Sequence, residues 1–211
     1  MHKKNIITAG KKLSADGKVL ILLHGRGGSA EDILSLVSYL EVKDFTIWAP
    51  QAANHTWYPY SFMAPPVQNE PGLSSALALL NELVSDLYSQ GIASDRIYFA
   101  GFSQGACLAL EFVTRHAAKY GGVVAFTGGL IGDRIYPENY SGDFQNTPVF
   151  IGTSNSDPHV PVERMYATVN ILQSMHAAVT GKVYANMGHT IIQDEIDQAN
   201  KLVFHPQPVK S

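Results

Sequence analysis

The stretch from residue 97 to residue 107 constrains this chain most, because an apolar run ends there in a serine flanked by glycines. Residues 97–100 are typical of a strand, and the residues after Gly105 have the apolar spacing of a helix. Between them lies Gly101-Phe102-Ser103-Gln104-Gly105. Small residues two before and two after a serine allow a sharp strand-to-helix turn, which exposes the hydroxyl beside a base. The pattern predicts that Ser103 is a nucleophile; the competing interpretation is a glycine-rich turn with a solvated serine.

The rest of the chain alternates between strand-like and helix-like segments. The strand-like segments are residues 19–23, 45–49, 96–100, 122–126, 149–153 and 182–185, and the helix-like segments begin at 29–30, 73, 106, 162 and after 189. Residues 4–18, with Asp-Gly at 16–17 as a turn, predict an edge hairpin. Alternation of this kind indicates a mainly parallel sheet covered on both faces, with ligands at the carboxyl ends of its strands. We therefore predict an α/β fold in which residues 1–211 form a single domain.

Composition narrows the class of protein and its partners. The chain has 211 residues, of which 45% are hydrophobic and 16% charged, so it is long enough for one sizeable core. A net charge of −3 without a long Lys/Arg run argues against nucleic-acid binding. The longest apolar stretch, 19–23, is too short to span a bilayer, and residues 3–12 do not resemble a secretory signal. The single cysteine, Cys107, fits a reducing compartment. We expect a cytoplasmic protein without integral membrane association, and a homodimer is among the assemblies that the sequence allows.

A serine nucleophile needs a proton acceptor, and the acceptor needs an orienting carboxylate. His189 lies in a short loop next to a glycine, between the last predicted strand and the final helix, where it can reach across the strand ends. Asp157 follows the strand at 149–153 and is the predicted carboxylate, although a turn or capping role is the alternative. His159 is a rival base because it lies so close to Asp157. The weaker carboxylate candidates are Asp133 and Asp143.

The developing oxyanion of an acyl transfer needs backbone N–H donors. In this architecture they come from the residue after the nucleophile and from the loop after an early strand, which nominates Gln104 and Arg26. Arg26 lies in the glycine-rich loop 24–28, where the absence of side chains lets the backbone approach a substrate closely. A phosphate-binding loop is the rival interpretation, but the segment lacks the glycine and lysine spacing of such loops.

The irregular segment 57–67 is unusually rich in bulky apolar side chains. On the functional interpretation it forms the wall of an acyl or aryl pocket, since ligand sites are mostly apolar. The alternative is that it packs as core beneath the helix at 73–90. The residues predicted to contact substrate are Trp57, Tyr58, Phe62 and Met63.

Four motifs, in this order, resemble the phospholipase/carboxylesterase family of α/β-hydrolases, which includes acyl-protein thioesterases. They are Leu-His-Gly-Arg-Gly-Gly at 23–28, Gly-Phe-Ser-Gln-Gly at 101–105, Asp-Pro-His-Val-Pro at 157–161 and Gly-His-Thr at 188–190. The resemblance covers residues 18–204 and implies an α/β-hydrolase fold with a doubly covered sheet and no large cap domain. It implies a serine hydrolase that cleaves carboxylic esters or thioesters of small molecules with neither a cofactor nor a metal. It assigns the catalytic triad to Ser103, Asp157 and His189, and the oxyanion hole to the N–H groups of Arg26 and Gln104.

The chain departs from the thioesterase branch at two places. That branch has Trp-Phe-Asp where this chain has Trp57-Tyr58-Pro59, and glycine where it has Ala106. The resemblance is therefore closer to a bacterial-type hydrolase of small esters. Two other functions stay open: a lactone hydrolase of the dienelactone type in aromatic catabolism, and a catalytically silent binding protein. Joint retention of Ser103, Asp157 and His189 argues against the silent protein.

Overall fold

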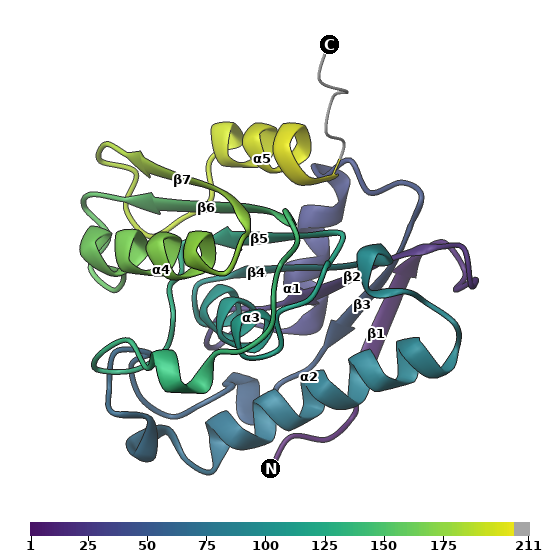
Figure 1. Ribbon diagram of the computed structural model, residues 1–211, viewed down its shortest axis with the longest axis horizontal. Helices are drawn as coiled ribbons and strands as arrows, with labels where there is room; N and C mark the ends of the chain where they lie inside the picture. The colour runs from purple at the N-terminus through teal and green to yellow at the C-terminus, as the bar shows by residue number, and fades with distance from the viewer. Residues whose placement is uncertain (205–211) are drawn as a thin grey trace.

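The computed structural model describes residues 1–204, and in this part of the chain seven strands form one sheet in the order β1-β3-β2-β4-β5-β6-β7 (Figure 1). All neighbouring strands are parallel except β1 and β3. The strands are β1 (Ile6–Gly10), β2 (Lys18–Leu23), β3 (Phe45–Pro50), β4 (Ile97–Phe102), β5 (Gly122–Phe126), β6 (Pro148–Ser154) and β7 (Ala178–Tyr184). The predicted mainly parallel sheet is confirmed, and residues 205–211 of the predicted domain lie outside the described residues.

The N-terminal segment forms an edge strand but not the predicted hairpin. β1 pairs with β3 in an antiparallel register from Ile6 opposite Pro50 to Gly10 opposite Thr46. β2 instead lies between β3 and β4. The physical reason is burial, because residues 19–23 are fully buried and a strand that is apolar on both faces belongs inside the sheet. The hairpin prediction was therefore wrong about the partner of β1.

Five α-helices cover the two faces of the sheet in the described part of the chain (Figure 1). They are α1 (Ala30–Leu34), α2 (Gly72–Ser89), α3 (Gln104–Arg115), α4 (Val162–Ser174) and α5 (Gln193–Ala199). Helices α2, α3 and α4 share one apolar cluster with one face of the sheet, and α1 and α5 share another with the opposite face. α1 begins with a capping box between Ser29 and Asp32, which satisfies N–H groups at its first turn. None of the helices at residues 1–204 is long and apolar enough to cross a membrane.

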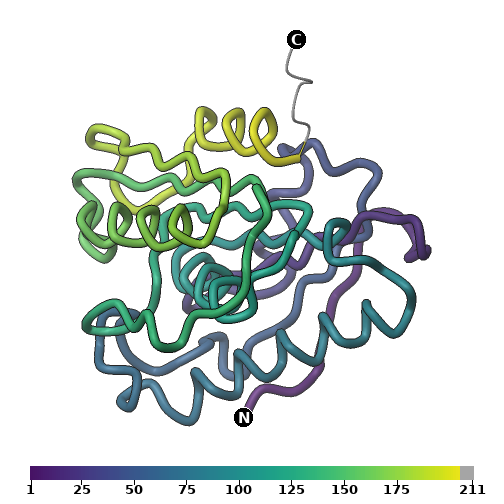
Figure 2. The backbone as a smooth tube through the Cα atoms, viewed as in Figure 1, coloured from purple at the N-terminus to yellow at the C-terminus, as the bar shows by residue number. Residues whose placement is uncertain are grey.

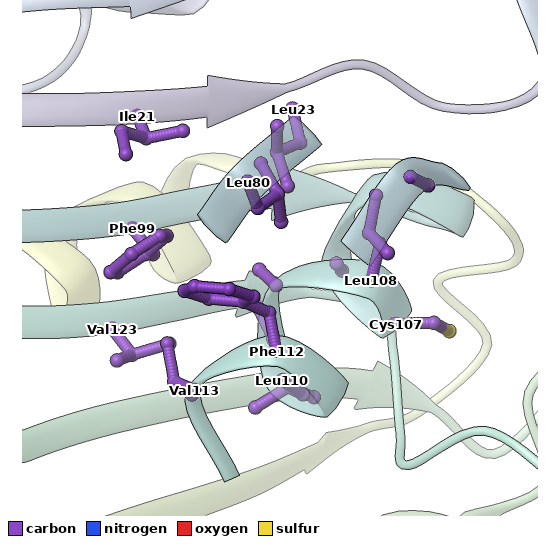
Figure 3. Close-up of a cluster of buried hydrophobic side chains, with 14 of the residues drawn as sticks. Ile21, Leu23, Leu80, Phe99, Cys107, Leu108, Leu110, Phe112, Val113 and Val123 are labelled. Atoms are coloured by element: carbon purple, nitrogen blue, oxygen red, sulfur yellow. The ribbon is translucent and has the colours of Figure 1, made fainter. Parts of the chain in front are cut away.

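Successive side chains of a buried strand point to opposite faces of the sheet, and this divides the core into the two clusters. Ile21 and Leu23 of β2 face α2 and α3, whereas Leu20 and Leu22 face the other side. Figure 3 shows Phe99 of β4 among the side chains of the first cluster. Its ring lies 5.6 Å from that of Phe112 on α3 and 5.3 Å from that of Tyr120, measured between centroids. This packing fixes α3 against the strand that precedes it.

Two long connections lie at the end of the sheet where the parallel strands finish. They are residues 51–71 between β3 and α2, and residues 127–147 between β5 and β6, which can be followed in Figure 2. Gly132 donates a backbone hydrogen bond of 2.7 Å to the carbonyl of Phe62, so the two segments are in contact. The buried amide of Asn69 orders the first by accepting from the N–H of Tyr60 and donating to the carbonyl of Ser61. Within residues 1–204, these two segments are the long connections at this end of the sheet, and there is no large cap domain.

Replacing Phe99 with alanine is expected to lower the free energy of unfolding by about 3 to 5 kcal/mol, because a fully buried ring is lost and a cavity remains. Urea unfolding monitored by circular dichroism measures the change. The matched control is Tyr166→Ala on α4, whose ring is 54% exposed, and it should change stability by less than about 0.5 kcal/mol. A Phe99→Ala variant as stable as the control would contradict this account of the core.

Candidate active site

Ser103 occupies the turn between β4 and α3, and its backbone has φ 53° and ψ −118°. Side chains rarely adopt such a positive φ, so the turn is strained. Its N–H donates a 3.0 Å hydrogen bond to the carbonyl of Phe126 at the end of β5. The flanking glycines are required sterically: a Cβ on Gly105 would lie 2.3 Å from the carbonyl oxygen of Leu23, and one on Gly101 would lie 2.5 Å from the carbonyl carbon of Gly105. The predicted strand-to-helix turn is thus present.

The structure brings the side chains of His189 and Asp157 to this serine. Nε2 of His189 lies 2.8 Å from Oγ of Ser103, and its Nδ1 lies 2.6 Å from Oδ2 of Asp157. The other oxygen, Oδ1, accepts the backbone N–H groups of His159 and Val160 at 2.7 and 2.9 Å. The Asp157 side chain is fully buried, and the imidazole of His189 is 22% exposed. Three N–H donors thus surround the buried carboxyl group of Asp157.

His159, the rival base, does not bond to the serine in this arrangement. Its backbone supports Asp157, and its ring lies 4.9 Å from the ring of His189 in an edge-on contact. Its side chain forms part of the cavity wall instead. The weaker carboxylates are engaged elsewhere, since Asp133 accepts from the hydroxyl of Tyr136 and Asp143 bonds to His176.

The loop that carries His189 is fixed at both ends by side chains that sequence reasoning missed. Oγ of Ser154, at the end of β6, accepts the N–H groups of Met187 and Gly188, each at 3.1 Å. Beyond the loop, Glu195 accepts the N–H of Ile192 at 3.2 Å. Burial raises the pKa of Glu195 to about 7. The sequence signal for Ser154 was the run of hydroxyl and amide side chains at 153–156. That run does not indicate which backbone N–H groups its side chains bind.

Two backbone N–H groups near Ser103, those of Gln104 and Arg26, were predicted to bind an oxyanion. The N–H of Gln104 opens α3, and the first N–H groups of a helix have no acceptor within it. In the described part of the chain, the N–H of Arg26 has no protein acceptor. The loop of Arg26 passes beside the nucleophile, since a Cβ built on Gly25 would lie 3.5 Å from Cβ of Ser103.

The side chains of Gln104 and Arg26 form hydrogen bonds to the segment at 56–60, and these bonds hold that segment next to Ser103. Oε1 of Gln104 accepts the N–H of Trp57 at 2.9 Å, and its Nε2 donates to the carbonyl of Tyr58 at 2.8 Å. Arg26 donates through Nη1 to Oγ1 of Thr56 and to the carbonyl of Pro59, and through Nη2 to the carbonyl of Tyr60. Sequence analysis assigned only backbone roles to both residues, because the carbonyls that their side chains bind lie far along the chain.

A cavity of about 560 Å³ opens beside Ser103 and His189. Tyr58 and Phe62 line it, as predicted. The prediction that Trp57 and Met63 contact substrate requires correction, because neither lines the cavity. Trp57 is fully buried, donates from Nε1 to the carbonyl of His24 at 2.9 Å and stacks near the His24 ring, while Met63 packs against the main core cluster. The segment 57–63 is therefore part core and part cavity wall.

Cys107 also lines this cavity, one helical turn after the serine, and is 1% exposed. Burial raises the pKa of its thiol to about 12, so the sulfur stays protonated and is a poor nucleophile at neutral pH. Among residues 1–204, His, Cys, Asp and Glu side chains nowhere gather in threes that could hold a metal ion.

The sheet topology together with a serine held at the end of β4 defines an α/β-hydrolase. The chain belongs to the phospholipase/carboxylesterase family, whose sequence model matches residues 3–204. The resemblance inferred from the motifs is confirmed. The chain is a hydrolytic enzyme of the carboxylesterase and thioesterase type.

Individual relatives agree with this assignment. The crystal structure of a phospholipase/carboxylesterase from Dyadobacter fermentans is 55% identical, with a TM-score of 0.94 over 96% of this chain and 97% of that chain. Acyl-protein thioesterase 1 of Saccharomyces cerevisiae is 26% identical over 92% of this chain and 94% of that protein. The protein of the same name from Gibberella zeae is 26% identical over 69% of this chain, and the match spans 63% of the relative.

Replacing Gln104 with alanine is expected to reduce stability by about 1 to 3 kcal/mol, because the N–H of Trp57 and the carbonyl of Tyr58 lose their buried partner. The KM for ester substrates should rise as well, since the cavity wall loses its attachment. Thermal unfolding and steady-state kinetics measure the two effects. Gln173→Ala, on the exposed side of α4, is the control and should leave both unchanged. Equal stability of the two variants would contradict the role given to the Gln104 amide.

Proposed function

We propose that the enzyme cleaves carboxylic esters and thioesters of small molecules through an acyl-enzyme on Ser103. The observation that carries the proposal is the continuous chain of hydrogen bonds from Oγ of Ser103 through His189 to Asp157. A cavity of about 560 Å³ lies within the size range of small-molecule sites. The names of the relatives, carboxylesterase and acyl-protein thioesterase, support the same two bond types.

In the acylation step, Oγ of Ser103 attacks the carbonyl carbon while its proton passes to Nε2 of His189. The carboxylate of Asp157 holds the proton of Nδ1, which leaves Nε2 free to accept, and it stabilises the imidazolium that forms. The N–H groups of Arg26 and Gln104 donate to the oxyanion of the tetrahedral intermediate. Nε2 then returns the proton to the oxygen or sulfur of the leaving group as its bond to carbon breaks.

Deacylation uses the same groups with water in place of the alcohol. His189 takes a proton from a water molecule that attacks the acyl carbon, and it then protonates Oγ of Ser103 as the acid departs. Cys107 takes no part, because its thiol is buried and protonated.

Ser103→Ala is expected to lower kcat by a factor on the order of 10⁴ to 10⁶, since only binding and oxyanion stabilisation remain. Hydrolysis of 4-nitrophenyl esters and of one thioester measures the loss. A fluorophosphonate should label the wild-type enzyme stoichiometrically, and peptide mapping should place the label on Ser103. Ser174→Ala, an exposed serine of α4, is the control. Full activity of Ser103→Ala would end the serine-hydrolase proposal.

His189→Ala should cost nearly as much as Ser103→Ala, and the double variant should lose little more, because the two groups act as one unit. Asp157→Asn should keep the fold but lose much of the rate through the wrong imidazole tautomer. His159→Ala should retain most of its kcat, because only its backbone supports Asp157. The base is misassigned if His159→Ala is inactive while His189→Ala remains active in the same assay.

A further inference from the structure

The described wall of the cavity beside Ser103 carries a cationic side chain but no acidic one. Of the described residues that line it, Arg26 is the only one with a permanent charge, and none is Asp or Glu. The other titratable lining residues are His159, His189, Tyr58, Tyr60 and Cys107. Neither histidine is negative in any state, and burial raises the pKa of both Tyr58 and Cys107, which favours their neutral forms. Arg26 is therefore the one permanent charge on the described cavity wall, and the carboxylate of Asp157 is buried behind His189.

The guanidinium of Arg26 is held by neutral acceptors only. They are Oγ1 of Thr56 at 3.1 Å, the carbonyl of Pro59 at 2.8 Å and the carbonyl of Tyr60 at 2.5 Å. Within residues 1–204, no carboxylate lies within 4.0 Å of Arg26. Asp32 lines a smaller neighbouring cavity that Arg26 also borders, but its Oδ2 accepts the N–H of Ser29 at 2.8 Å. The positive charge of Arg26 thus has no paired carboxylate among residues 1–204.

The same hydrogen bonds pre-organise the guanidinium. An arginine has five N–H donors, and Arg26 uses two on Nη1 and one on Nη2, which leaves the Nε–H and one Nη2–H. Two N–H donors are the number that a carboxylate accepts in a fork. Because the side chain is already fixed to the segment at 56–60, little further ordering is needed when an anion binds.

We propose that the natural substrate is an ester or thioester that carries a carboxylate, and that the side chain of Arg26 binds this carboxylate while Ser103 attacks the ester carbon. The inference rests on the proposed function of Ser103 and adds the substrate class. Arg26 then has two separate roles: its backbone N–H serves the oxyanion and its side chain selects the substrate. The carboxylate belongs either to the acyl part or to the leaving group, and both are tested separately.

The test compares kcat/KM for pairs of esters that differ only in this charge. The acyl pair is 4-nitrophenyl hemiglutarate and its methyl ester, and the leaving-group pair is 4-acetoxybenzoate and its methyl ester. In one of the two pairs, the wild-type enzyme should prefer the anion by about 10- to 100-fold at low salt, the scale of a hydrogen bond to a charged group. Arg26→Gln should bring the preference close to one, Arg26→Lys should retain part of it, and added salt should weaken it in the wild type.

Arg96→Gln is the control, because it removes the same charge at the opposite end of β4 from Ser103 and should keep the preference. Absence of a preference in both pairs, or a preference unchanged in Arg26→Gln, overturns the proposal. These outcomes are separate from a failure of the serine mechanism, which would appear as retained hydrolysis of neutral esters by Ser103→Ala.

Inhibition of the wild-type enzyme tests the proposal even if Arg26→Gln loses activity by disturbing the cavity wall. With a neutral ester as substrate, glutarate should inhibit at least tenfold more strongly than monomethyl glutarate, or 4-hydroxybenzoate more strongly than its methyl ester, again on the scale of one charged hydrogen bond. Equal inhibition constants within both pairs would exclude a carboxylate subsite at Arg26.

Discussion

The strained backbone of Ser103 is the constraint on which the other parts of the site depend. A residue at φ 53° and ψ −118° costs on the order of 1 to 3 kcal/mol and persists only where its surroundings enforce it. Here the enforcement comes from the centre of the sheet, through the hydrogen bond to Phe126 and the contact of Gly105 with the end of β2. The packing of Phe99 and Phe112 between β4 and α3 holds the two arms of the turn together (Figure 3). A rigid core therefore determines where the hydroxyl points.

The partners of the serine come from the loops after β6 and β7, and these two strands follow β5 in order in the same sheet. Because parallel strands end at one edge, residues that are 54 and 86 positions from Ser103 meet there without a domain closure. Ser154 ties the last loop to the end of β6 with two N–H bonds. His189 is thus positioned by neighbouring backbone as well as by Asp157.

Most of the fold was predictable because the buried strands are apolar on both faces and alternate with helical periodicity. The pairing of β1 with β3 could not be predicted. An edge strand pairs with whichever strand still has unpaired backbone groups once β2 lies inside the sheet, and the local sequence does not show which strand that is. Ser103, Asp157 and His189 were brought together as expected, because each lies in a short polar break after a strand. Trp57 was misplaced, because apolar composition does not distinguish a cavity wall from core. The roles of the Gln104 and Arg26 side chains depend on distant carbonyls and have no local sequence signal.

The attachment of Gln104 and Arg26 to a single segment, 56–60, has a consequence for how such an enzyme changes during evolution. The two residues proposed to donate N–H groups to the oxyanion also bind, through their side chains, a segment that lines the cavity. An insertion or a change of backbone path in that wall would displace the donors, so substrate range and turnover could not vary independently under such a change. The opposite wall, at His159 and Val160, makes no hydrogen bond to Gln104 or Arg26 among residues 1–204, but it lies directly against Asp157. New specificities are therefore expected to arise through substitutions that preserve backbone geometry, and not through loop exchange.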